Sequence, residues 1–133
     1  MCIRDRYGTD NSEFIQKVND EILVVVLIEE IDAVENLDEI LAVDHIDIFF
    51  VAPGDLAQTM GYPGQMYLPE VKKVVSDTLD RIISSGRNAG SLAGDETFEA
   101  HAEIGVKFFF HVYDHWLRAG AKAHWARVSA AEK

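Results

Sequence analysis

The sequence predicts an α/β fold in which parallel strands and helices alternate along one domain. Apolar runs at four places indicate strands, and the segments between them carry apolar residues at helical spacing. The strand-like runs are continuous rather than alternating, which is typical of parallel sheets covered on both faces. The expected strands are residues 21–29, 46–53 and 106–114, together with a weaker third strand at 87–94.

The segments around these strands are expected to be helical. The clearest is 69–86, where Pro69 suits the first turn, Gly86 suits the stop, and an apolar stripe recurs at helical spacing. The other expected helices are residues 13–20, 33–43, 95–105 and 116–133. Residues 52–70 are expected to form a long loop, and long loops usually indicate a functional role.

An open doubly wound sheet and half of a (β/α)8 barrel both fit this order of elements. A complete barrel needs about 250 residues, whereas this chain has 133. Residues 1–6, MCIRDR, match the translation of a transposon sequencing adaptor (ATG TGT ATA AGA GAC AG), so we interpret them as an artefact. We therefore expect residues 7–133 to be a partial barrel domain and the true protein to continue upstream.

Charge and composition exclude several classes of partner. The net charge of −11 argues against nucleic acid and anionic membranes, because both attract basic surfaces. No apolar run reaches the roughly 18 residues that a membrane span needs. The single cysteine, Cys2, lies in the adaptor-like segment, so we expect no disulfide and a reducing, cytoplasmic location.

Two acids, Glu29 and Asp55, are the main candidates for chemistry. Each lies near the C-terminal end of an expected strand, and the two strands are consecutive. Parallel neighbours lie about 4.8 Å apart, and α/β folds form their sites at these strand ends. One interpretation is a divalent metal site, which needs carboxylate oxygens of this kind. The other is that both acids cap the helices that follow, and the pattern alone leaves both open.

The histidines show no zinc-binding spacing. His45 precedes a strand, so we expect a structural role at the opposite rim. His101 is expected to be solvated on its helix. His111 lies inside the fourth strand and could face either side of the sheet, whereas His115 follows that strand and could line a site.

Three stretches carry a resemblance to a known family: VVVLIEE, VDHIDIFFVAPGDLAQTMGYPGQMYLPEV and GVKFFFHVYD. The most specific is the strand–turn motif (I/V)-D-x-x-F-x-x-P-x-D-L at residues 46–56, which a G-Y-x-G loop follows. Over about residues 7–128 the chain resembles the second half of the HpcH/HpaI aldolases. The resemblance implies a (β/α)8 barrel, of which this chain would be the C-terminal half.

The resemblance also implies an activity, that of a class II aldolase. Such a lyase cleaves or forms a carbon–carbon bond in a 4-hydroxy-2-oxo acid through a pyruvate enolate, with an aldehyde as the second partner. It implies a divalent metal, Mg²⁺ or Mn²⁺, held by Glu29 and Asp55. The implied substrate-binding residues are Pro53, Gly54, Asp55 and Leu56.

Further expectations follow from the family pattern. Loop 59–68 would border the aldehyde, and the complete protein would form a homo-oligomer with Trp116 and Trp125 at the interface. Leu27 stands where glutamine is frequent, and Val112 stands where glycine is frequent.

The resemblance leaves the catalytic residues outside this chain. The family's base histidine and oxyanion-stabilising arginine come from strands before residue 7, so we expect the chain alone to be inactive. Two alternatives stay open. One is an enzyme similar to citryl- or malyl-CoA lyase, and the other is a non-catalytic metabolite-binding barrel, which the change at Leu27 would indicate.

Overall fold

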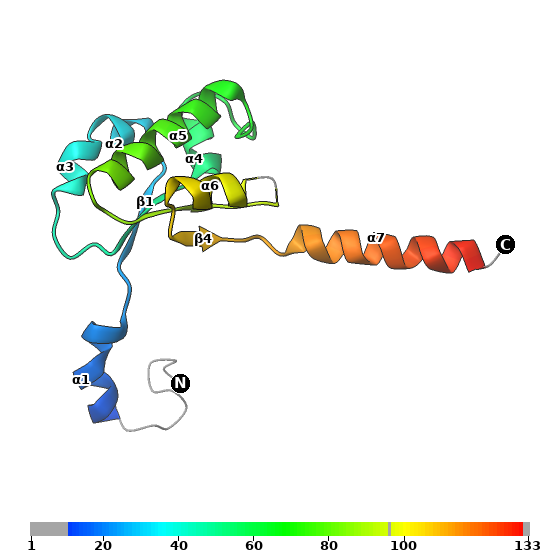
Figure 1. Ribbon diagram of the computed structural model, residues 1–133, viewed down its shortest axis with the longest axis horizontal. Coiled ribbons are helices and arrows are strands. Elements are labelled where there is room, and N and C mark those ends of the chain that lie inside the picture. The colour runs from blue at the N-terminus through cyan, green and yellow to red at the C-terminus, as the bar shows by residue number, and fades with distance from the viewer. Residues whose placement is uncertain (1–10, 96, 132–133) are drawn as a thin grey trace.

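The computed structural model describes residues 11–95 and 97–131, and its centre is a four-stranded parallel sheet (Figure 1). The strands are β1 (Val25–Ile28), β2 (Ile48–Val51), β3 (Ala89–Leu92) and β4 (Phe108–Phe110), and they lie side by side in chain order. A doubly wound sheet reverses its strand order at a switch point, whereas a barrel places each strand beside the next. The observed order therefore confirms the half-barrel and excludes the doubly wound sheet.

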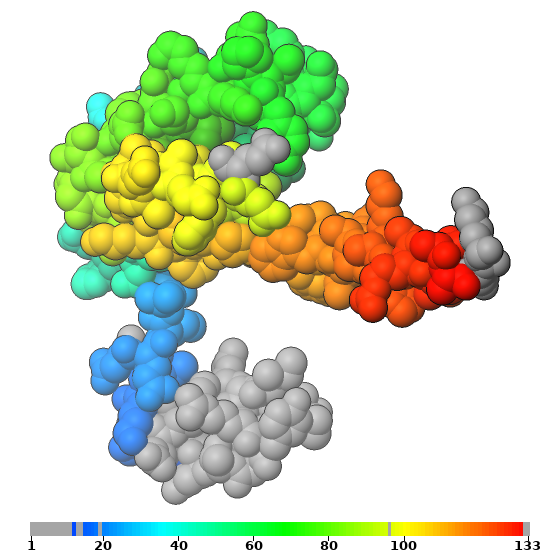
Figure 2. Space-filling model, turned by 45° about the vertical axis from the view of Figure 1, so that its right-hand side comes forward, coloured from blue at the N-terminus to red at the C-terminus, as the bar shows by residue number. Residues whose placement is uncertain are grey.

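Helices connect the strands and cover one face of the sheet. They are α1 (Asn11–Glu21), α2 (Ile31–Glu35), α3 (Leu37–Leu41), α4 (Pro53–Thr59), α5 (Pro69–Ser84), α6 (Phe98–Ile104) and α7 (Asp114–Ala131). Helices α2 to α6 form the body together with the sheet, while α1 and α7 stand apart from it (Figures 1 and 2). Among the described residues, none of the helices is both long enough and apolar enough to cross a membrane.

Two expected elements differ from the structure. The expected helix 33–43 is two short helices that meet at Asn36, where the backbone (φ −92°, ψ 16°) leaves the helical conformation and the nearby Val34 carbonyl accepts a hydrogen bond from Arg81. The expected loop 52–70 begins with α4, which Pro53 starts at a position that proline favours, so only residues 60–68 form the loop. The expected strands are all present but shorter.

The face of the sheet that the helices cover holds the core, and we call it the covered face. The strand register aligns Ile28 with Val51 and Val51 with Ser91, so these three side chains lie on the same side. All three are almost completely buried. The apolar stripe of α5 packs against this face as predicted, through Val71, Val75, Leu79 and Ile82.

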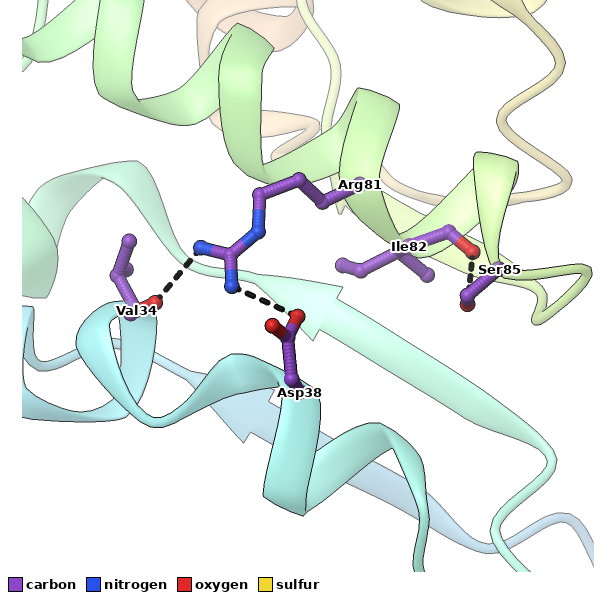
Figure 3. Close-up of polar contacts among 5 residues, drawn as sticks. All are labelled: Val34, Asp38, Arg81, Ile82 and Ser85. Carbon is purple, nitrogen blue, oxygen red and sulfur yellow. Dashed lines mark hydrogen bonds and ion pairs between the residues drawn. The ribbon is translucent and has the colours of Figure 1, made fainter.

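Arg81 ties the two short helices to α5 (Figure 3). Its guanidinium donates one hydrogen bond to the Val34 carbonyl and another to the Asp38 carboxylate, both at 2.9 Å. The Asp38 side chain is largely exposed, so the ion pair itself contributes little to stability. Near the end of the same helix, the Ser85 hydroxyl donates to the Ile82 carbonyl at 2.7 Å. Through Arg81, the segment that follows β1 is fixed against the helix layer.

Candidate active site

The other face of the sheet lines a cavity of about 490 Å³, and we call it the open face. The residues of the strands and of the segments just after them that line it are spaced by two, as expected for one side of a pleated sheet: Val25, Leu27 and Glu29 along and just after β1, Phe50 and Ala52 along and just after β2, and Phe108, Phe110 and Val112 along and just after β4. In a complete barrel this side faces the interior. The cavity is therefore the inner surface of the half-barrel.

A glycine shapes the floor of the cavity. The register aligns Phe50, Gly90 and Phe108 across three strands. The two phenylalanine rings meet edge to face across Gly90, with their centroids 6.2 Å apart. A Cβ atom on Gly90 would lie 3.0 Å from the Phe50 ring and 3.1 Å from the Phe108 carbonyl, so no larger residue fits without movement. This arrangement was missed in the sequence, although a glycine in the weak third strand is a typical sign of such close packing.

Glu29 and Asp55 line this cavity together. Glu29 directly follows β1, and Asp55 is the third residue of α4, which begins two residues after β2 ends. The register places Ile28 beside Val51, so the two strand ends lie at the same rim. The helix-capping interpretation of both acids is wrong, because the N-cap positions of α2 and α4 are Glu30 and Ala52.

The two carboxylates have no partner within the residues that the structure describes. Neither accepts a hydrogen bond or joins an ion pair there, and the described cavity lining contains no lysine, arginine or histidine. Two anionic groups therefore face one largely apolar cavity with no protein cation beside them. A bound cation would offset their charge.

The donor set fits a hard divalent cation with few protein ligands. No group of three or more His, Cys, Asp or Glu side chains suited to a metal occurs in residues 11–95 and 97–131. Mg²⁺ usually keeps several waters and binds proteins through one or two carboxylates. Glu29 and Asp55 match that pattern, with water or substrate oxygens supplying the remaining ligands.

The other expected substrate-binding residues divide into two groups. Pro53 and Gly54 line the cavity, and the space around Gly54 is open, with no atom within 4 Å of the position that its Cβ would take. Leu56 does not line the cavity, because its side chain is fully buried and lies in the core behind the sheet. The Leu56 side chain is therefore not part of the site. Met66 brings the loop 60–68 to the cavity.

The two positions that were expected to differ from the family pattern, Leu27 and Val112, both face the site. Leu27 lies two residues before Glu29, on the same side of β1, and its side chain is 54% exposed in the cavity. Val112 lines the cavity from the end of β4. The sequence differences therefore affect the surface that a substrate would contact.

None of the described histidines lines the cavity. His111 faces the covered side, where its ring lies 5.8 Å from the Phe98 ring and 5.7 Å from the Trp116 ring. His115 also contacts Trp116, at 4.9 Å between centroids. The expectation that His101 is solvated holds only in part: the residue is half-buried, its Nδ1 is buried without a partner among the described residues, and burial lowers the pKa of its imidazole.

The fold and this rim define a class of protein. A parallel half-barrel that gathers acids from adjacent strands at the C-terminal rim is typical of (β/α)8-barrel enzymes. The family model described as HpcH/HpaI aldolase/citrate lyase matches residues 3–108, and the chain therefore belongs to that family.

Curated relatives and solved structures agree with this family. The chain is 39% identical to the hydroxypyruvate/pyruvate aldolase of Sagittula stellata, over 77% of this chain and 41% of the relative. It is 36% identical to the 4-hydroxy-2-oxo-heptane-1,7-dioate aldolase of Escherichia coli, over 89% of this chain and 46% of the relative. The chain thus spans less than half the length of these relatives.

Among solved structures, an HpcH/HpaI aldolase/citrate lyase family protein from Burkholderia cenocepacia is similar in fold. The TM-score is 0.77 at 25% sequence identity, and the match covers 88% of this chain and 46% of that protein. An HpcH/HpaI aldolase from Desulfitobacterium hafniense matches with a TM-score of 0.70 at 26% identity, over 90% of this chain and 48% of that protein. The half-barrel therefore corresponds to about half of the solved proteins.

Proposed function

We propose that this chain supplies the metal-binding half of a (β/α)8-barrel aldolase that cleaves or forms a carbon–carbon bond next to a pyruvate unit. The observation that carries the proposal is that Glu29 and Asp55, from adjacent strand ends, line one cavity and have no other partner among the described residues. The family membership and the names of the relatives, which are pyruvate-type aldolases, support the same activity.

The proposed roles of the residues follow from their places at the rim. Glu29 and Asp55 would hold a divalent cation, Mg²⁺ or Mn²⁺, between the first two strands. When bound, such a cation supplies Lewis-acid stabilisation of the negative charge that develops on the pyruvate oxygens. Pro53 and Gly54 would border the pyruvate carboxylate, because the open space around Gly54 lets a ligand approach the backbone. Met66 would border the aldehyde.

The apolar wall of the cavity would strengthen the binding of a cation by the two acids. Leu27, Phe110 and Val112 line the cavity around the acids and limit the number of polar groups there. A water-poor site strengthens the attraction between the carboxylates and a cation, since charges interact more strongly where the effective dielectric is low. In a complete barrel, where the other half would cover them, these side chains would therefore exclude water from the reacting centre.

The relatives favour the aldolase over a lyase that acts on a CoA thioester. Those reported above are named as aldolases for pyruvate-type compounds. A metabolite-binding barrel without catalysis would use the same two acids, so only a measurement of turnover separates it from the enzyme.

We propose in addition that the complete protein is a homo-oligomer that uses α7. This helix projects from the body (Figure 2), and it presents Leu117 and Trp125, each 64% exposed. Trp116 is partly engaged within the chain, because its indole N–H donates to the Asp95 carboxylate at 3.0 Å. The cytoplasmic location stays a prediction.

The first experiment measures Mn²⁺ binding to the 133-residue chain, from the electron paramagnetic resonance signal of the free ion. Glu29→Gln and Asp55→Asn should each weaken Mn²⁺ binding at least tenfold, because each removes one of two charged ligands. Glu30→Gln is the matched control, since Glu30 is the neighbouring acid but does not line the cavity. Equal binding by wild type and Glu29→Gln would contradict the proposal.

The second experiment measures turnover in a complete barrel. Residues 7–128 of this chain replace the matching half of the Sagittula stellata aldolase, and pyruvate release is followed with a coupled dehydrogenase. The complete barrel should release pyruvate only when metal is present, while the chain alone should be inactive. Metal binding without any turnover in the complete barrel would favour the non-catalytic alternative.

A further inference from the structure

The two acids of the site come from separate segments, so their spacing depends on what joins those segments. Glu29 lies in the turn between β1 and α2, and Asp55 lies in the first turn of α4. The backbone provides one link, because the Ala52 N–H donates to the Ile28 carbonyl at 3.1 Å. This hydrogen bond joins only the ends of the two strands. Glu29 and Asp55 lie beyond those ends, so fixing their spacing requires a further connection.

Thr59 provides a connection beyond the strands. Its hydroxyl oxygen accepts a hydrogen bond from the Ile31 N–H at 3.2 Å, and its hydroxyl donates to the Leu56 carbonyl at 3.0 Å. Ile31 is the first residue of α2 and stands two residues after Glu29. Thr59 is the last residue of α4 and stands four residues, or about one turn, after Asp55. One hydroxyl therefore joins the start of one segment to the helix that carries the other acid.

The first turn of α2 explains why this hydroxyl is needed. The first backbone N–H groups of a helix have no partner within the helix and usually bond to the side chain at the N-cap. The N-cap residue of α2 is Glu30, and its side chain makes no capping hydrogen bond. Thr59 supplies the missing acceptor from a different helix, so the cap of α2 is also a tie between the two acid-bearing segments.

We propose that Thr59 is a positioning residue for the Glu29–Asp55 pair, an inference that rests on the proposed metal-binding function. A metal ion tolerates only small deviations in the positions of its ligands. Groups that orient ligands without touching the metal commonly change metal affinity by 10- to 100-fold. Thr59 acts in this way through the backbone at Ile31, and it contributes no ligand of its own.

The test compares Mn²⁺ affinity among variants of the 133-residue chain. Thr59→Val removes the hydroxyl at nearly constant volume, and we expect about tenfold weaker Mn²⁺ binding. Thr59→Ser keeps the hydroxyl and should bind within about twofold of wild type. Thr97→Val is the matched control, because among the described residues the Thr97 hydroxyl bonds only with the nearby backbone N–H and carbonyl of Gly94, away from the cavity.

A second variant removes the same hydrogen bond from its other end. Ile31→Pro deletes the donor N–H at the first position of a helix, which proline favours, and the preceding residue Glu30 already has the extended backbone that proline requires. This variant should also bind Mn²⁺ about tenfold more weakly. Combining it with Thr59→Val should cause little further loss, because both changes remove one interaction.

The outcomes separate this inference from the function on which it rests. If Glu29→Gln abolishes Mn²⁺ binding while Thr59→Val and Ile31→Pro bind like wild type, the positioning role is overturned and the metal site stands. If Thr59→Ser binds Mn²⁺ as weakly as Thr59→Val, the hydroxyl is not the group that positions the acids, and the inference also fails. If the wild-type chain does not bind Mn²⁺, or Glu29→Gln has no effect, both proposals fail. Should Thr59→Val not fold, Ile31→Pro and Thr59→Ser decide the question.

Discussion

The two faces of the sheet have similar apolar residues but different surroundings. Leu27 and Ile28 are neighbours in β1, yet Leu27 is 54% exposed on the open face and Ile28 is 1% exposed on the covered face. The same contrast recurs in β4, where Phe109 packs towards the helices and Phe110 lines the cavity. A continuous apolar strand therefore serves two purposes, with one side holding the core together and the other forming the wall of a site.

The largest expected difference between the faces is in stability. Leu79 is fully buried in α5 against the covered face. Replacing it with alanine leaves a cavity, and such changes cost about 2–5 kcal/mol. Leu27→Ala is the matched change on the open face, and we expect it to alter the free energy of unfolding of this chain by about 0.5 kcal/mol or less. Urea unfolding followed by circular dichroism measures both.

This pair also tests the division between the faces. Equal losses for Leu79→Ala and Leu27→Ala would mean that the open face is buried in solution, for example against another molecule. In a complete barrel the loss for Leu27→Ala should grow, because the other half would cover that side chain.

A smaller effect is expected at Gly90, the most crowded of the described glycines, which lies on the open face. The Cβ of Gly90→Ala would meet Ile48 and Phe50 at 3.0 Å and the Phe108 carbonyl at 3.1 Å. Overpacking of this kind typically costs about 1–3 kcal/mol. Gly94→Ala is the control, because its Cβ would meet no atom within 4 Å. The thermal midpoints of the two variants should differ, and equal midpoints would show that the floor of the cavity yields easily.

The smallest expected effect concerns pH on the covered side. Burial lowers the pKa of His101 below its usual 6.5, so the folded state binds fewer protons than the unfolded state at acidic pH. The contribution of His101 to stability is therefore complete above pH 6.5 and decreases as the pH falls below that value. His101→Gln should reduce the pH dependence of the unfolding midpoint in this range. An unchanged pH profile would show that the imidazole is open to solvent.

Much of the fold could be predicted from the sequence, because its signals are local. The α5 stripe, Pro69 and the stop at Gly86 all depend on spacing and backbone conformation within one segment, and Gly86 indeed has a φ of 81°. The break at Asn36 was missed because the nearby Val34 carbonyl bonds to Arg81, 47 residues away in the chain, and no local pattern indicates that contact. The α4 helix was missed because Pro53 and Gly54 also look like an ordinary turn.

The site was only partly predictable. Strand order allowed Glu29 and Asp55 to be placed at one rim, since residues near the ends of consecutive parallel strands must lie close together. Leu56 was placed wrongly because it lies in the helix α4, where successive side chains point about 100° apart, so Leu56 points into the core while Asp55 faces the cavity. Thr59 gave no signal at all, because its bond to Ile31 joins segments 28 residues apart in the chain.

The order of the strands has a consequence for inheritance. The strands β1 and β2 are neighbours in both sequence and space. The proposed metal ligands Glu29 and Asp55 and the positioning residue Thr59 are therefore all encoded within one continuous segment of the gene, residues 25–59. A recombination event with its junction before Val25 would transfer both proposed metal ligands together and join them to a different N-terminal half-barrel. The catalytic residues of the N-terminal half would then change while the proposed metal site is kept.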